Sequence, residues 1–316
     1  MLFRSSQSSR MNCGRRSVEP VPSERGQRGP KDDPVITAPN VEIRHRLAVE
    51  VPPLRQAAVQ LLHLAGDPAA SIAQIVNLLR ADPVLTMGLL QVANSPLFAA
   101  RHEITNVRQA VTYLGLDLVR SLAVTAAARG LIGTRPNPLS LPFWRHSLAT
   151  ALTCRKMCGV TSISPEYAHT AGILHDVGQL GLIHLFPDYG QTIGASVQRG
   201  ESLTDAESRA FGIDHCQAGR LLLSRWRLPV ELQSVAAGHE CPSSKATGDG
   251  YLIALVHAGS LAAEFMGFAV IPPPRNVEPR DIAAAFPDER RQGVVESLPE
   301  LVASVRQHVN SIEMSL

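Results

Sequence analysis

The chain has 316 residues, of which 45% are hydrophobic, 18% charged and 4% aromatic, and its formal net charge is +2. This composition excludes an intrinsically disordered chain, and the small net charge gives no global field that would attract nucleic acid or an acidic partner. Few aromatic residues among many Ala and Leu residues favour packed helices over β-architecture. We therefore expect an all-α protein.

Residues 1–45 are rich in Arg, Ser, Gly and Pro, and we predict that they form a disordered tail. The arginines of this tail support no more than weak, salt-sensitive contact with nucleic acid, so nucleic acid is not an expected partner. Met1 and Met11 both remain open as the true start.

Helical spacing begins near Val51 and predicts an N-terminal helical subdomain over residues 46–134. Ser71 with Gln74 reads as a capping box, and its helix is expected to bury Ile72, Ile75, Val76 and Leu79. Asp82 before Pro83 predicts the start of the next helix, and Thr105 is expected to cap another. A further helix is predicted over Leu116–Arg129. The turn-rich stretch 133–138 separates this subdomain from the second half.

A second helical subdomain is expected over residues 139–268, with helix starts marked by Ser164, by Thr204 with Glu207, and by Asp214. Its helices are predicted at Leu141–Met157, Pro165–His175, Pro187–Arg199, Asp205–Phe211, His215–Trp226, Val230–His239 and Tyr251–Met266. The apolar stretch Leu252–Ile271 contains Glu264, so we interpret it as a core helix and not as a membrane span. Residues 272–316 are expected to form a weakly structured tail with one helix at Leu298–Asn310.

The five cysteines contain no CxxC pair, and this predicts a reduced, cytoplasmic protein. Cys154 and Cys158 lie four residues apart, and we interpret them as small buried residues and not as a metal or redox pair. The remaining three are Cys13, Cys216 and Cys241.

The stretch Ala168–Leu182 carries an adjacent His175–Asp176 pair in a mostly apolar helical run that Gly178 and Gly181 are expected to break. Aspartate is costly to bury unless it is paired or holds a cation. Histidines on neighbouring helices could join this pair, and imidazole with carboxylate suits Zn, Fe, Mn or Ni. The candidate metal ligands are His146, His175, Asp176, His215 and His239.

Residues 51 to about 245 resemble the HDOD domain of bacterial signalling proteins, which is similar in fold to HD-type phosphohydrolases and to HD-GYP phosphodiesterases. The resemblance rests on motifs in a fixed order: VPPL (51–54), DPAASIAQI (67–75), ADPVLTMGLLQVANSPLF (81–98), ITNVRQAVTYLGLDLVRSLA (104–123), FWRHS (143–147), AGILHDVGQLGL (171–182), FGIDHCQAGRLL (211–222) and WRLP (226–229). It implies a two-part helical architecture. It also implies that His146, the His175–Asp176 pair, His215 and His239 match the family's metal-binding positions.

The same resemblance shows three departures from the catalytic pattern. Gln179 stands where catalytic relatives carry a lysine, Gly238–His239 replaces a pair of histidines, and Ser260 stands where a late aspartate is expected. The GYP segment is absent as well. Three interpretations of the degenerate site remain open: buried hydrogen bonds that hold helices together, metal binding without turnover, and hydrolysis.

The leading hypothesis is a non-catalytic regulatory module that acts through protein–protein contacts and senses a ligand, with no residue assigned as catalytic. We expect a signalling protein partner in trans, no membrane partner, and leave homo-oligomer formation open. No organic cofactor is expected, and a divalent metal (Mn, Fe, Zn or Mg) is the cofactor left open. The alternative is a metal-dependent phosphohydrolase acting on a nucleotide or cyclic dinucleotide.

Overall fold

The computed structural model consists of helices joined by short loops, and the residues that it describes contain no strand. The chain divides into two units, Met1–Thr37 and Ala38–Leu316, and only the second is described below. The described residues are 38–53, 56–65, 71–94, 102–116, 118–119, 125, 137–160, 163–242 and 250–315. Within them the all-α prediction is confirmed.

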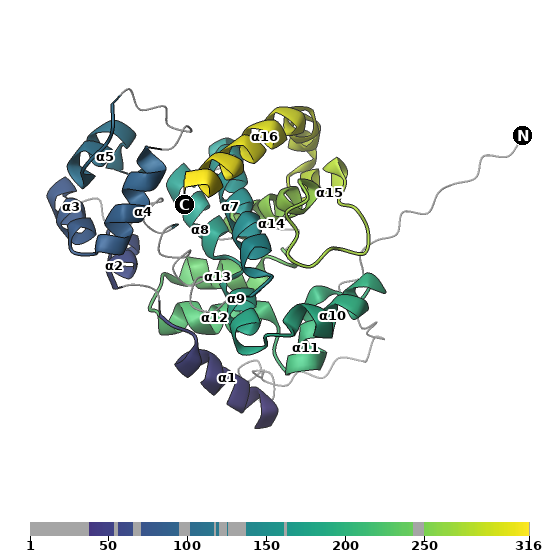
Figure 1. Cartoon of the computed structure of the whole chain (residues 1–316). Coiled ribbons are helices and arrows are strands. Elements are labelled where there is room, and N and C mark those ends of the chain that lie inside the picture. Colours follow the sequence, from purple (N-terminus) through teal and green to yellow (C-terminus); the bar gives the residue numbers. More distant parts are fainter. Residues whose placement is uncertain are drawn as a thin grey trace, which may run out of the picture. The chain divides into compact units, whose positions relative to one another are not determined.

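The first half consists of short helices (Figure 1), which are α1 (Ala38–Glu50), α2 (Gln56–Ala65), α3 (Ile72–Arg80), α4 (Pro83–Ala93) and α5 (Val107–Leu114). Helices α2 to α5 form a chain of neighbouring contacts, whereas α1 packs on α9 and α12 of the second half. Helix α1 begins at Ala38, so the last residues of the tail predicted over 1–45 are helical. The helix predicted at Leu116–Arg129 lies largely outside the described residues.

Local capping signals account for several of these helix starts. The capping box of Ser71 and Gln74 is present, and the side chain of Asp82 accepts a hydrogen bond from the Leu85 backbone N–H at 3.2 Å. The prediction of Thr105 as a cap is wrong. Asn106 caps α5, and its side chain accepts from the backbone of Gln109.

The buried face of α3 is confirmed with one exception. Ile75, Val76 and Leu79 are buried, but Ile72 is 56% exposed. Ile72 is the first residue of the helix, where the neighbouring turn that would cover it has not yet formed.

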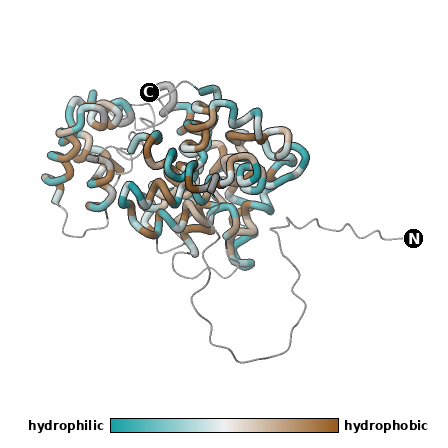
Figure 2. Tube along the Cα trace, turned by 90° about the horizontal axis from the view of Figure 1, so that it is seen from below, coloured by the Kyte–Doolittle hydropathy of each residue, from teal (hydrophilic) through white to brown (hydrophobic). Residues whose placement is uncertain are grey.

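The second half contains the more buried helices, which are α7 (Ser140–Met157), α8 (Pro165–Leu174), α9 (Val177–Leu185), α10 (Tyr189–Gln198), α11 (Leu203–Phe211), α12 (His215–Arg225), α13 (Val230–Gly238) and α14 (Gly250–Phe265). Helix α7 packs between α8 and α14, while α12 packs on both α9 and α13. Along the trace, hydrophobic and hydrophilic residues alternate as expected for helices that bury one face (Figure 2).

Two helix crossings are close because glycine occupies the contact. A Cβ on Gly172 of α8 would lie 2.6 Å from Cα of Ala151 on α7, and one on Gly178 of α9 would lie 1.9 Å from the His215 carbonyl oxygen. The prediction that Gly178 and Gly181 break the helix is therefore wrong. The break falls earlier, between α8 and α9, and Gly178 allows α9 to approach α12.

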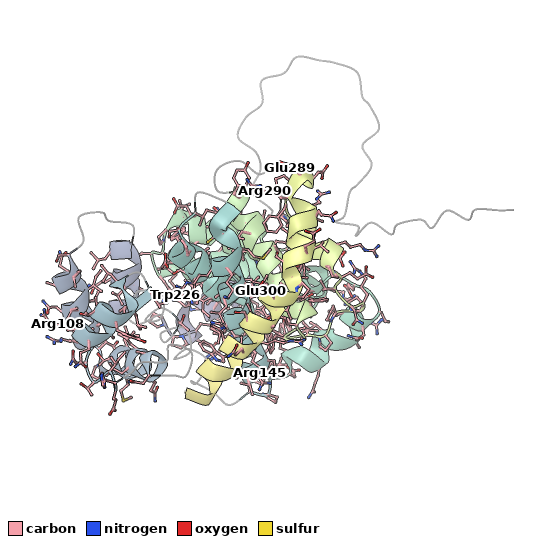
Figure 3. All side chains as sticks on the ribbon, turned by 90° about the horizontal axis from the view of Figure 1, so that it is seen from above. Arg108, Arg145, Trp226, Glu289, Arg290 and Glu300 are labelled. Carbon is pink, nitrogen blue, oxygen red and sulfur yellow. The ribbon has the colours of Figure 1, made fainter. Side chains whose placement is uncertain are left out.

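The C-terminal region is more regular than the sequence suggested. Helix α15 (Pro279–Ala283) precedes α16 (Asp288–Ser315), and α16 packs on α7, α15 and α4. The single helix predicted at Leu298–Asn310 thus starts ten residues too late, since the first turns of α16 are polar and exposed. Figure 3 shows Glu289, Arg290 and Glu300 spread along this helix.

The described helices include none that is long and apolar enough to span a membrane. The apolar stretch that raised this question forms α14, and its residue Ser260 faces the site described next.

Candidate metal centre

The five residues singled out in the sequence meet around one carboxylate. His146 comes from α7, His175 and Asp176 form the turn between α8 and α9, His215 begins α12, and His239 follows α13. Asp176 lies at the middle of the four imidazoles. The Nε2 atoms lie at these distances from its carboxylate oxygens: 3.0 Å for His239, 3.3 Å for His175, 3.5 Å for His146 and 3.7 Å for His215.

The ring of each histidine is oriented by a contact of Nδ1, the nitrogen that does not face Asp176. In every case Nδ1 faces an oxygen that can only accept, so Nδ1–H is the donor. This fixes the ring and directs Nε2 to the centre, which is the arrangement commonly found for metal-binding histidines. The Nδ1 partners are Phe268 O for His146 at 3.2 Å, Gly172 O for His175 at 2.7 Å, Ala236 O for His239 at 3.2 Å and Glu207 Oε2 for His215 at 2.6 Å.

The inner atoms of the centre are buried and face one another at 3.0–3.7 Å, but they make no well-directed hydrogen bond. This is true of Nε2 of His175, His215 and His239 and of Oδ1 of Asp176. The side chain of Asp176 is 8% exposed. Because a buried polar atom without a partner is costly, such a cluster of nitrogen and oxygen donors fits a divalent cation of the Zn, Fe or Mn type.

The two carboxylate oxygens of Asp176 face different pairs of histidines. Oδ2 is nearest to His146 and His175, whereas Oδ1 is nearest to His215 and His239. Ligand atoms of His146, His175 and Asp176 lie within 4.8 Å of one another, and the other two histidines form a second such group with Cys216. The centre therefore has two halves that share one carboxylate.

Two carboxylates outside the predicted set of ligands, Glu207 and Glu240, make this region electronegative, and the raised pKa of Glu264 reflects it. Glu207 is fully buried and accepts hydrogen bonds from the backbone N–H and from Nδ1 of His215 at 2.9 and 2.6 Å. Glu240 Oε1 lies 3.5 Å from Nε2 of His215, and its side chain is 41% exposed. Burial raises the pKa of Glu264 to about 8, and Glu240 and Asp176 add to this effect by repulsion.

The pKa shifts of Asp176, His215 and His239 favour positive charge between these carboxylates, whereas burial lowers the pKa of His146 to about 4. Burial would raise the pKa of Asp176, but His175 and His239 hold it well below its usual range. Burial would lower the pKa of His215, but Glu207 raises it well above its usual value. The pKa of His239 is likewise raised, against burial, to about 9 by Cys216 and Asp176. A bound cation would supply the same positive charge.

Glu207 and Glu240 could not be placed from sequence because their role depends on contacts between helices. The prediction that Glu207 is the capping partner of Thr204 is wrong, since Ser202 caps α11 through the Asp205 backbone N–H. One signal was available, in that Glu240 directly follows His239.

The structure also shows the surroundings of Gln179 and Ser260, two residues that depart from the catalytic pattern. Gln179 is buried and donates a hydrogen bond to the Tyr189 hydroxyl, and this hydroxyl donates to Glu207. Ser260 lies beside the centre with its Oγ 3.3 Å from Nε2 of His146. It contributes a neutral hydroxyl at the place where the resemblance expects a carboxylate.

An all-helical fold around a buried His–Asp centre thus defines the class of protein. Residues 51–242 match the HDOD domain family, and because this match covers more than half of the sequence, the chain belongs to that family. A curated relative, an uncharacterized protein of Treponema pallidum (strain Nichols), is 20% identical over 199 residues, which are 61% of this chain. That region spans only 38% of the relative's length.

Solved structures share the fold over most of the chain. An HDOD domain protein of unknown function from Geobacter sulfurreducens superposes with a TM-score of 0.71 at 25% identity, covering 87% of this chain and 99% of that one. A protein of Shewanella amazonensis SB2B named as a candidate phosphohydrolase gives 0.66 at 22% identity, with coverages of 85% and 98%. A candidate signal transduction protein of Marinobacter aquaeolei VT8 gives 0.67 at 22%, with 86% and 61%.

Proposed function

We propose that this chain is a regulatory HDOD module that binds a divalent cation at its His–Asp centre without turning over a substrate, and that it acts through contacts with a signalling protein. The observation that carries the proposal is the convergence of four oriented imidazoles on Asp176, with inner atoms that have no hydrogen-bond partner. The distances among these atoms are 3.0–3.7 Å without a well-directed hydrogen bond, whereas a bound cation would satisfy all of them together.

The residues around the centre do not favour turnover of a phosphate substrate. A cation in such a site would neutralise a phosphate and acidify a water molecule if both could reach it. Gln179 brings no positive charge toward a phosphate, and it is engaged with Tyr189. Ser260 leaves the His146 side without a second carboxylate, and the imidazoles are at most 4% exposed.

A metal-dependent phosphohydrolase acting on a nucleotide or cyclic dinucleotide is the second candidate. One observation favours it: the two oxygens of Asp176 face two different histidine pairs. A carboxylate in that position can bridge two cations, as in enzymes that clamp a phosphate between two metals. Glu240, on the more exposed side of the centre, would then lie nearest to an incoming substrate.

Metal analysis of the purified protein, combined with a phosphodiesterase assay in Mn²⁺, separates the two candidates. The proposal predicts a bound cation, no turnover, and loss of the cation in Asp176→Ala. Asp288→Ala is the matched control, because that side chain is 86% exposed on α16. Turnover that disappears in Asp176→Ala would establish the second candidate. A protein that takes up no cation from excess Mn²⁺ or Zn²⁺ would overturn both.

A further inference from the structure

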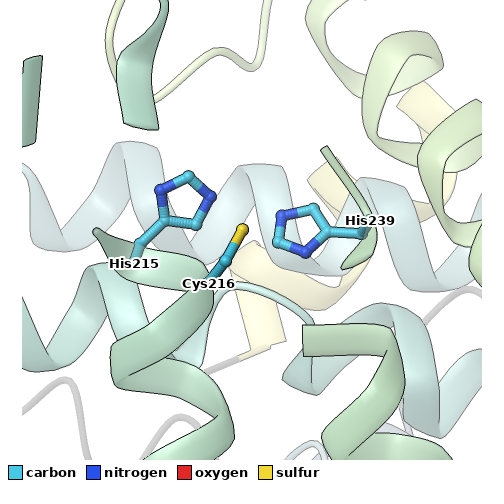
Figure 4. Close-up of side chains that lie close together, drawn as sticks. All are labelled: His215, Cys216 and His239. Carbon is cyan, nitrogen blue, oxygen red and sulfur yellow. The ribbon is translucent and has the colours of Figure 1, made fainter. Parts of the chain in front are cut away.

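Cys216 is placed where a cysteine can act as a ligand. It is the second residue of α12, directly after His215, and it is buried. Its Sγ and one ring nitrogen each of His215 and His239 lie within 4.8 Å of one another. Figure 4 shows the sulfur between the two imidazoles. The first turn of a helix also favours a negatively charged group, because unpaired backbone N–H groups point toward it.

The two histidines of this group are prepared for a ligand independently of the cysteine. His215 and His239 are buried, and Nε2 of each lacks a hydrogen-bond partner. Both Nε2 atoms also face Glu240 Oε1, at 3.5 and 3.7 Å. Two nitrogens, one sulfur and one carboxylate oxygen make up a four-donor set of the kind that binds Zn²⁺.

We propose that His215, Cys216 and His239, with Glu240 as the fourth donor, form a thiolate site for a borderline-soft cation such as Zn²⁺. The inference rests on the proposed function in one respect, that a cation occupies the centre. It adds Cys216 as a ligand, and it adds a preference of this half of the centre for softer cations such as Zn²⁺. The half of the centre formed by His146, His175 and Asp176 offers only nitrogen and oxygen donors, which harder cations such as Mn²⁺ accept.

Binding would convert the Cys216 thiol to a thiolate and would require Nε2 of His215 and His239 to be unprotonated, so the protons that these groups carry would pass to solvent. Glu240 gives the cation a route to the site, because its side chain is 41% exposed whereas those of His215 and His239 are at most 1% exposed. An incoming cation would first meet the carboxylate of Glu240, which would then remain bound to it as a ligand.

The test uses the full chain, stripped of cations with a chelator and titrated with Co²⁺, whose thiolate complexes absorb strongly in the near ultraviolet. The wild type should develop this sulfur-to-cobalt absorption, and Zn²⁺ should abolish it by displacement. Cys216→Ser should lose it and bind Zn²⁺ about 10–100-fold more weakly, with Mn²⁺ affinity little changed. Cys158→Ser is the matched control, since Cys158 is also buried but donates to Arg155 O, a bond that serine can keep.

Each outcome decides the question. A wild type that binds Co²⁺ without thiolate absorption would overturn the thiolate site and leave the proposed function standing. Equal Zn²⁺ affinity in wild type and Cys216→Ser would overturn it as well. No binding of either Co²⁺ or Zn²⁺ would contradict the proposed function itself. Should Cys216→Ser unfold, Cys216→Ala and the wild-type absorption, which needs no variant, still give the answer.

Discussion

The close crossing of α9 and α12 predicts that Gly178→Ala disrupts both the fold and the centre. A Cβ at this position would lie 1.9 Å from the carbonyl oxygen of His215 and 2.3 Å from the backbone nitrogen of Gly219. Both atoms belong to the backbone, so no side-chain rotation relieves the overlap. The helices would have to move apart by about 1 Å to bring the shorter distance to the 3.0 Å below which real Cβ contacts are not found.

The expected magnitude follows from this movement. Overpacking typically costs about 1–3 kcal/mol, and a clash between two backbones places Gly178→Ala at the upper end of that range or beyond it. His215 lies on the displaced helix, and its Nε2 is 3.7 Å from Oδ1 of Asp176. Because ligand positions in a cation site are tolerated to within roughly 0.2 Å, cation affinity should fall at least about tenfold.

Urea denaturation measures the first effect and isothermal titration with Zn²⁺ or Mn²⁺ the second. Gly194→Ala is the matched control, because it lies within α10 and a Cβ there meets no heavy atom within 4 Å. That change should leave binding intact and stabilise the protein by about 0.5–1 kcal/mol. If Gly178→Ala were as stable as Gly194→Ala and bound cations equally well, the crossing would not position His215 as argued.

Three further predictions concern single side chains. Glu207→Gln should weaken cation binding about 10–100-fold in calorimetry, because the carboxylate that orients His215 becomes a neutral amide; unchanged affinity would contradict this role. Ser260→Asp should strengthen Mn²⁺ binding about tenfold by placing a carboxylate beside His146, and Ser260→Asn should not. Burial lowers the pKa of His169 to about 3, so the unfolded state takes up the proton first and stability should fall by about 2 kcal/mol from pH 7 to pH 5. His169→Gln should flatten that part of the pH profile of urea unfolding.

Many of the helices were predictable because they depend on local sequence features, namely apolar residues at helical spacing and capping residues at helix starts. Ser164 and Asp214 cap α8 and α12 as expected, since each side chain accepts from a backbone N–H three residues ahead. Where two capping residues stand close together, the sequence could not choose between them. Thr204 was predicted to cap α11, but Ser202 does so. Likewise Thr105 was predicted to cap α5, but Asn106 does so.

The candidate site was predictable only in part. Residues from four stretches could be named because histidine and aspartate on apolar helices are unusual, and the structure brings them together. Glu207 and Cys216 were not recognised. Glutamate on an amphipathic helix is ordinary, and a single cysteine is most often a small core residue. Their importance comes from helix packing, which no local pattern contains.

Four of the five residues of the centre lie where helices begin, end or turn, and only His146 lies inside a helix. Asp176 sits at the turn between α8 and α9, His215 at the start of α12 and His239 at the end of α13. Such ends fray first when a protein loosens. A cation bound there would stabilise several helix ends at once, so its binding or release would change the rigidity of the helical bundle. A partner protein that contacts the bundle would then respond to this change in rigidity, and no reaction product would be needed.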